Sequence, residues 1–363
     1  MKAFSLAAAV LLLCGGASAQ IALPRPSLLP PDSTAPVPEV RGVAVDEDGV
    51  PLSPEEQRTN FLYGEISNRL KKTIIGRGRH KRRVNNGVTP ADRVERGEIK
   101  YIVVHSAMGP CEGAINTMEK HHAAAHFMVC EGGSVTRLVA IKDIALHVKN
   151  KEINAASVGI ETETGYNDGT EKFALADWDP DTRWRMYASL AWLIRAVAEE
   201  AGVPRDEQHI IGHYDADLGI PRAHTDPGPM YYGQSYPAFD KRFPGQGVTP
   251  KTFLMMLVRD DAPPVVERAP AGSGEVLRVR EANKTGVGRV KLFRLGGKKP
   301  EPVREWVAGA RGFPPDSVDL PFPTEPGDYR VEAFDLVGNM TRARFTVAPA
   351  GQGGLRATAV EQY

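Results

Sequence analysis

The sequence predicts a mixed α/β domain, in which helices flank a central β-sheet, followed by a small β-sandwich. Between residues 99 and 260, apolar runs of strand length alternate with helical patterns, as in an α/β unit. Beyond residue 275 the hydrophobic period changes to two, with turns between the segments. The 363-residue length favours two or three units, and 42% hydrophobic with 25% charged residues is typical of a soluble globular protein.

The α/β segment contains clear strand and helix signals. Buried strands are expected at Ile99–Val104, Phe127–Val129 and Val158–Ile160. The strongest helix begins after Asp179, an N-cap residue followed by Pro180, and ends at Gly202. A last helix begins at Thr249-Pro250 and is expected to pack on the sheet.

The C-terminal segment is predicted to be all-β. Its apolar or alternating runs are Val276–Arg280, Val290–Phe293, Tyr329–Phe334 and Ala343–Val347. The stretch Tyr329–Val347 resembles the last hairpin of bacterial immunoglobulin-like modules, which implies an Ig-like β-sandwich over 275–348. We expect a proline-containing linker at 261–274 and a flexible glycine-rich tail at 349–363.

The N-terminus has the features of a secretory signal. Lys2 precedes an apolar run, and Ala17-Ser18-Ala19 offers small residues for cleavage before Gln20, so residues 1–19 are expected to be removed. The run is shorter than the about 20 apolar residues of a membrane span, and no later segment qualifies. We therefore expect an exported protein, in the periplasm or outside the cell, without a transmembrane segment. Lipidation at Cys14 is the alternative.

Two further N-terminal segments precede the α/β domain. Residues 20–54 are rich in proline and are expected to form a disordered linker. Residues 55–98 form a basic extension, which is either a solvated face or a contact to the anionic cell envelope. With 45 basic and 45 acidic side chains in the whole chain, no strong field favours nucleic acid as a partner.

Cysteine usage favours one disulfide. If Cys14 is removed with the signal, Cys111 and Cys130 are the two cysteines left. An even number in an oxidising compartment favours a disulfide, and two buried thiols are the alternative.

Two histidines occupy positions suited to metal binding. His105 ends an apolar strand, and His213 follows the run Ile210-Ile211-Gly212. A ligand at the end of a strand has a rigid base and an exposed tip. One such histidine would more often be a core residue, but two, followed by Thr225-Asp226-Pro227-Gly228-Pro229, favour a site.

Five short motifs carry a resemblance to a known family. They are Val103–Ala107, Ala125–Val129, Ser157–Glu161, Ile211–His213 and Thr225–Pro229. Together and in this order they resemble the type 2 N-acetylmuramoyl-L-alanine amidases, which include bacteriophage lysozyme-type amidases and animal peptidoglycan-recognition proteins. The resemblance covers roughly residues 99–229 and implies the amidase fold for residues 99–260.

The resemblance implies a zinc site and a base. His105, His213 and Asp226 match the family's Zn²⁺ ligands, and three protein ligands leave a position open, as in catalytic zinc sites. Glu161 matches the family's general base, although Glu163 would share its face. His224 replaces a lysine that many members carry, so an imidazole is expected to stabilise the oxyanion here. The alternatives are that another group has this role or that His224 is a third imidazole on the zinc.

Two further histidines, His126 and His147, lie near motif positions that line the family's substrate groove. The resemblance thus implies a zinc-dependent N-acetylmuramoyl-L-alanine amidase acting on peptidoglycan, and we expect a monomer. A peptidoglycan-binding module without catalysis is the alternative, although all three ligands are present. A zinc peptidase is disfavoured because the sequence has no His-Glu-x-x-His motif.

Overall fold

The computed structural model describes most of the chain from residue 98 onwards. The described residues are 40–41, 88–89, 98–121, 123–139, 141, 143–165, 178–220, 226–227, 229–233, 235–272, 274–297, 299–309, 312–350 and 354–363. The expected signal, almost all of the proline-rich and basic segments, and His224 lie outside them. Within the described part, none of the helices combines the length and apolar character of a membrane span.

A six-stranded mixed sheet forms the centre of the first unit, which we call the α/β unit (β3 to α10). The strand order is β1-β5-β4-β7-β3-β8, with β4, β7, β3 and β8 parallel and β5 antiparallel to β4. The strands are β1 (Val40–Arg41), β3 (Tyr101–Met108), β4 (Phe127–Val129), β5 (Val135–Arg137), β7 (Ser157–Gly165) and β8 (Ile210–Gly212). The predicted mixed sheet is confirmed, and β2 (Val88–Thr89) pairs separately with β6 (Ile144–Ala145).

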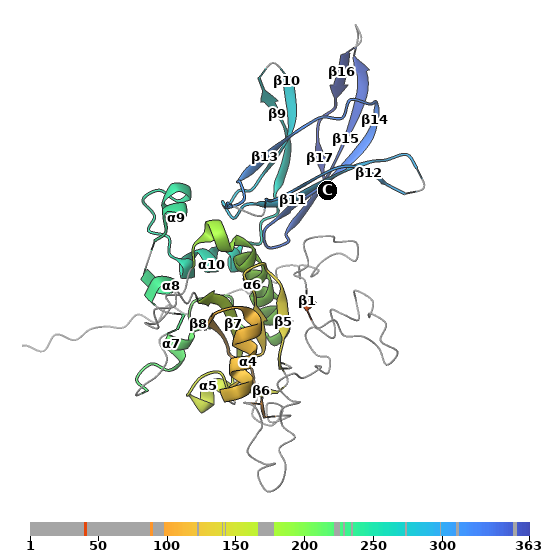
Figure 1. The fold of residues 1–363 in the computed structure, drawn as a ribbon. Helices are drawn as coiled ribbons and strands as arrows, with labels where there is room; N and C mark the ends of the chain where they lie inside the picture. Colours follow the sequence, from red (N-terminus) through yellow and green to blue (C-terminus); the bar gives the residue numbers. More distant parts are fainter. Residues whose placement is uncertain are drawn as a thin grey trace, which may run out of the picture.

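Helices α4 to α7 lie against strands of this unit, and α8 to α10 pack on other helices (Figure 1). They are α4 (Cys111–His121), α5 (Lys151–Ala155), α6 (Pro180–Ala201), α7 (His213–Ala216), α8 (Pro229–Gly233), α9 (Pro237–Arg242) and α10 (Pro250–Arg259). Helix α6 has the predicted bounds, because Asp179 caps the amide of Asp181 and Gly202 adopts a left-handed φ of 70°. Helix α10 begins after Thr249, as predicted. The expected packing of α10 on the sheet is wrong, because α10 packs mainly on α6, which itself contacts β4 and β7. The apolar faces of both helices belong to the main core cluster.

The C-terminal part is the β-rich unit (β9 to β17), which Figure 1 shows at the far end of the molecule from α4 and α5. Its strands are β9 (Val265–Ala271), β10 (Gly274–Arg280), β11 (Val287–Arg294), β12 (Glu301–Val307), β13 (Ser317–Pro321), β14 (Gly327–Asp335), β15 (Met340–Ala350), β16 (Gly354–Ala357) and β17 (Glu361–Gln362). They form a sheet β13-β10-β9 and a sheet β12-β11-β14-β15-β16, with β17 on β15. Both sheets contribute to one apolar core.

Two boundaries in this unit differ from expectation. The segment 261–274, expected as a linker, contains β9, which pairs with β10 over its whole length. The expected flexible tail at 349–363 contains β16 and β17, both paired with β15. Prolines and glycines suggested irregular chain in both places, but edge strands tolerate them where a neighbouring strand supplies backbone partners.

The two units share an apolar and polar contact. Leu336 and Val337 of the β-rich unit belong to the same core cluster as helices α6 and α10. Phe313 packs on Phe253 of α10 with ring centroids 5.2 Å apart, and the guanidinium of Arg242 lies 4.1 Å above the Phe313 ring. The interface is thus a continuation of the core.

A disulfide joins Cys111, the first residue of α4, to Cys130, which follows β4. The predicted pairing is therefore present, and it ties α4 to the sheet across 19 residues of sequence. Such a crosslink reduces the conformational freedom of the unfolded chain.

Replacing both cysteines, as Cys111→Ser with Cys130→Ser, is expected to lower the free energy of unfolding by about 3 kcal/mol, the loop-closure value for a loop of this length. Urea denaturation of the two proteins measures the difference. A reducing agent should destabilise the unaltered protein to the same extent and leave the double variant unchanged. Equal stability of the oxidised protein and the double variant would contradict the expectation.

Candidate active site

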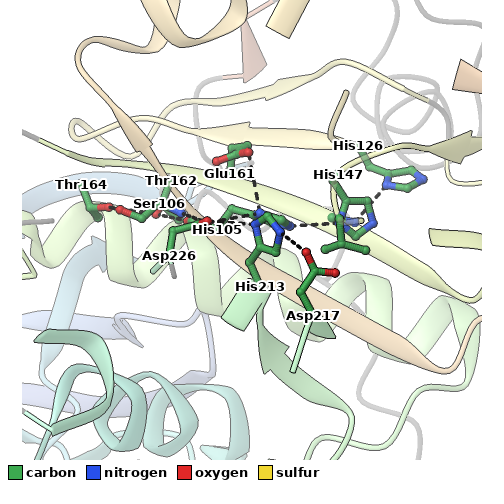
Figure 2. A network of polar contacts seen from close by, with 12 residues as sticks. His105, Ser106, His126, His147, Glu161, Thr162, Thr164, His213, Asp217 and Asp226 are labelled. Atoms are coloured by element: carbon green, nitrogen blue, oxygen red, sulfur yellow. Dashed lines mark hydrogen bonds and ion pairs between the residues drawn. The ribbon is translucent and has the colours of Figure 1, made fainter. Parts of the chain in front are cut away.

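Three parallel strands bring the first candidate residues together. In the register of β3 with β7, His105 lies beside Glu161. In the register of β3 with β8, Val104 lies beside Gly212, so His105 and His213 are adjacent at the next position. Strand β3 continues to Met108 instead of ending at His105, because its pairing with β7 continues. The side chains still converge at one end of the sheet (Figure 2).

Asp226 completes this cluster from the loop before α8. Its Oδ1 lies 2.9 Å from Nδ1 of His213, and its Oδ2 lies 3.3 Å from Nδ1 of His105. The backbone amide of Ser106 donates to the same Oδ2 at 3.3 Å. One ligand atom of each of His105, His213 and Asp226 lies within 4.8 Å of the others. The structure therefore brings the three predicted ligands to one point.

The electrostatics of the cluster favour an ionised Asp226. Burial by itself opposes ionisation, but hydrogen bonds to His105 and His213 outweigh it and hold the pKa of Asp226 well below its usual range. Burial lowers the pKa of His213, but the contacts with Asp226 and Asp217 outweigh this effect and raise the pKa above its ordinary value. Two imidazole nitrogens and one carboxylate form a donor set that suits Zn²⁺.

The far side of each imidazole is also held. Nε2 of His105 lies 3.0 Å from Nδ1 of His147, and Nε2 of His213 lies 3.0 Å from Oδ2 of Asp217. Nε2 of His147 in turn lies 3.0 Å from the Ser157 hydroxyl. These contacts orient both rings with Nδ1 towards Asp226, as partners behind metal-binding histidines commonly do.

Asp217 is a residue that the sequence reasoning missed. Its side chain is fully buried, and it accepts hydrogen bonds from the backbone amides of Lys149 and Asn150. The available signal was its position four residues after His213, which places a carboxylate next to that ring on one helical turn.

Glu161 lies at the edge of the cluster. Its Oε1 is 3.8 Å from Nδ1 of His105, and its side chain is 17% exposed, so it is within reach of both the cluster and solvent. Burial raises the pKa of Glu161, and the charge of Asp226 adds to this, whereas His105 and His213 oppose it. Glu163, two residues on, instead accepts a hydrogen bond from the Glu131 amide at 3.0 Å.

His126 and His147 occupy interior positions. His126 is fully buried, accepts from the Gly159 amide at Nδ1 and contacts the Asp143 carbonyl at Nε2. Both ring nitrogens of His147 are also bonded, to His105 and Ser157. The predicted contact of these rings with substrate therefore finds no support in the geometry, because their polar atoms are engaged within the protein.

Two glycines of the sequence motifs permit close packing around the cluster. A Cβ at Gly159 would lie 2.5 Å from the His147 ring, and one at Gly212 would lie 1.9 Å from the Tyr232 hydroxyl. The hydroxyl of Tyr232 donates to Asp215. Both positions exclude a side chain because another ring occupies that space.

The family comparison agrees with this geometry. Residues 95–229 match the family described as N-acetylmuramoyl-L-alanine amidase. This segment belongs to the type 2 amidase family. The matched residues contain the whole cluster from His105 to Asp226, so we refer to the α/β unit as the amidase domain.

Solved structures of similar proteins are also amidases and endolysins. A selenomethionine derivative of AmpD is 20% identical, with 39% of this chain and 86% of that chain covered and a TM-score of 0.27. The amidase LysCS of Clostridium intestinale URNW is 17% identical, with 36% and 76% covered and a TM-score of 0.25. The Ph2119 endolysin from Thermus scotoductus MAT2119 bacteriophage Ph2119 is 21% identical, with 38% and 82% covered and a TM-score of 0.27. No curated protein matches the sequence.

The packing at Gly159 allows a test of the amidase domain. We expect Gly159→Ala to lower the free energy of unfolding by about 1–3 kcal/mol, because the new methyl group would overlap His147 and displace it. Urea denaturation measures this change. Gly113→Ala in α4 is the matched control, since a Cβ there meets nothing within 4 Å. Equal changes in the free energy of unfolding for the two substitutions would show that the close approach of the His147 ring to Gly159 does not restrict residue 159 to glycine.

Proposed function

We propose that the protein is an exported, zinc-dependent N-acetylmuramoyl-L-alanine amidase, which hydrolyses the amide between N-acetylmuramic acid and L-alanine in peptidoglycan. The observation that carries this proposal is the convergence of two Nδ1 atoms and one carboxylate beside a separate, partly exposed Glu161. The family of residues 95–229 supports the reaction class.

The residues fit a catalytic zinc ion. We assign His105, His213 and Asp226 as its ligands, with His147 and Asp217 as positioning residues behind the two imidazoles. Three protein ligands leave a position for water or substrate, which distinguishes catalytic from structural zinc sites. When bound, Zn²⁺ would polarise the scissile carbonyl and lower the pKa of a water molecule.

Glu161 is the proposed general base. The oxygen of the attacking water forms a bond to the lactyl carbonyl carbon, and Glu161 accepts the proton that the water loses. The same carboxyl then donates a proton to the nitrogen of L-alanine as the C–N bond breaks, so one residue serves both half-steps. The orientation of Glu163 towards Glu131 favours Glu161 for this role. We assign the oxyanion contact to His224.

The remaining parts of the chain complete the proposal. We propose that residues 1–19 direct export and that the amidase domain extends over 99–260. The β-rich unit, in which two sheets enclose one core, is proposed to be an Ig-like β-sandwich.

Metal removal and Glu161→Gln test the enzyme directly. We expect 1,10-phenanthroline to abolish release of new N-terminal L-alanine from purified peptidoglycan, and added Zn²⁺ to restore it. Glu161→Gln should lower kcat by about 10²–10⁴-fold, the usual contribution of general acid–base catalysis. Glu163→Gln on the same strand is the matched control and should retain activity. Binding to peptidoglycan without release under any metal condition would identify a recognition module instead.

Asp217→Asn tests the positioning residues. We expect zinc affinity to fall by about 10–100-fold, because the neutral amide would orient the His213 ring less strongly. Competition with a chromogenic chelator measures this affinity, and excess Zn²⁺ should restore most of the activity. Asp206→Asn is the control, since Asp206 and His209 form a similar pair, 2.7 Å apart, outside the cluster. An unchanged zinc affinity of the Asp217→Asn protein would show that Asp217 does not help to position the metal ligands.

A further inference from the structure

A second cluster of carboxylates lies at the junction of the two units. Asp260, Glu281 and Asp335 are 3%, 2% and 0% exposed, and one carboxylate oxygen of each lies within 4.8 Å of the others. Three buried carboxylates at this separation repel one another and are costly to desolvate.

Each carboxylate comes from a different structural element. Asp260 is the C-cap of α10, the last helix of the amidase domain. Glu281 directly follows β10, and Asp335 is the last residue of β14, both in the β-rich unit. A group that binds all three carboxylates would therefore connect the amidase domain to the β-rich unit.

Hydrogen-bond donors fix two of the carboxylates from outside. Oδ1 of Asp260 accepts from the Asn283 side chain at 2.7 Å, and its Oδ2 accepts from the Thr285 hydroxyl at 2.5 Å. Oδ1 of Asp335 accepts from the backbone amides of Val337 and Asn339, each at 2.9 Å. Such donors favour the ionised form and hold the carboxylates in one orientation.

Glu281 has an oxygen that lacks a partner. Its Oε1 accepts from the Asn283 amide at 2.8 Å, whereas its Oε2 is buried and has no hydrogen-bond partner. A buried polar atom without a partner costs about 1–3 kcal/mol, and more when charged, so such an atom calls for a ligand. This oxygen is independent of the clustering and points to a missing partner.

The arginines near the cluster form their hydrogen bonds with other groups, although the charge of Arg195 acts on Asp260 and Asp335 and that of Arg242 acts on Glu281. Arg195 donates to the Asp260 carbonyl, to Asp261 and to the side chain of Asn339. Two further pairs are Arg205 with Asp261 and Arg242 with Asp316. The five carboxylates are those of Asp260, Asp261, Glu281, Asp316 and Asp335, and the three guanidinium groups are those of Arg195, Arg205 and Arg242. With all five carboxylates ionised, as a bound cation requires, the five negative and three positive charges leave an excess of two negative charges.

We propose that Asp260, Glu281 and Asp335 bind a hard divalent cation of the Ca²⁺ class, which joins the amidase domain to the β-rich unit. The spacing of the oxygens suits one ion with Ca–O distances of about 2.3–2.6 Å. The ligands are all oxygens, which disfavours zinc and copper. Three carboxylates favour Ca²⁺ over Mg²⁺, which takes one or two carboxylates and retains several waters.

Calcium titration of the full-length protein tests the site. The protein is passed over a chelating resin, reloaded with one equivalent of Zn²⁺, and titrated with CaCl₂ by isothermal titration calorimetry. We expect one Ca²⁺ site and a rise in Tm that MgCl₂ does not reproduce. Glu281→Gln, which keeps the shape but removes the charge, should weaken Ca²⁺ binding at least ten-fold. Glu267→Gln in β9, whose side chain is 44% exposed, is the control and should bind normally.

Several outcomes would overturn the proposal. They are absence of Ca²⁺ binding and of any Tm rise in the unaltered protein, equal effects of Mg²⁺, or unchanged Ca²⁺ affinity in Glu281→Gln. The unaltered protein could also fail to respond to Ca²⁺ while the Glu281→Gln protein is more stable than the unaltered one. That result would show that the carboxyl groups of the cluster share a proton and do not bind a cation. Asp335→Asn is the second variant if Glu281→Gln does not fold. Peptidoglycan hydrolysis is measured separately from Ca²⁺ binding and Tm. If the amidase proposal is wrong, the calcium proposal can therefore still be tested.

Discussion

The parallel pairing of β3 with β7 and β8 is the constraint on which the site depends. Its register places His105 beside Glu161 on one side and beside His213 on the other. A slip of one residue would turn His105 to the opposite face of the sheet. The buried apolar residues of these strands resist such a slip, because Ile102 and Val104 pack in one core cluster and Val103 in another, and the same shift would exchange the two faces.

A second layer of polar contacts converts this register into a defined geometry. His147 and Asp217 hold the outer nitrogens of the two imidazoles, so that both Nδ1 atoms face Asp226. The glycine at 159 lets His147 approach closely enough to do so. Rigid support of this kind reduces the reorganisation that metal binding and catalysis require.

The two carboxylate-containing clusters differ in chemistry and in place. The one at the sheet combines imidazole nitrogens with Asp226 and remains partly open at Glu161, as a site for hydrolysis requires. The one at the junction contains only oxygen ligands, is fully enclosed, and links elements of both units. The first suits catalysis, whereas the second suits attachment of one unit to the other. The apolar core that continues across the junction supports the same attachment.

The sequence by itself determined the main helices and strands of the sheet and the three residues proposed as metal ligands. The caps at Asp179 and Gly202 delimit α6, and His105 and His213 follow directly from apolar strand patterns, because local signals specify both. Only the tertiary structure decided the rest. Asp217 was not recognised, His126 and His147 lie inside the protein, and Asp260 meets Glu281 and Asp335 across the junction. These relations depend on long-range packing and shared burial, which residue spacing along the chain does not encode.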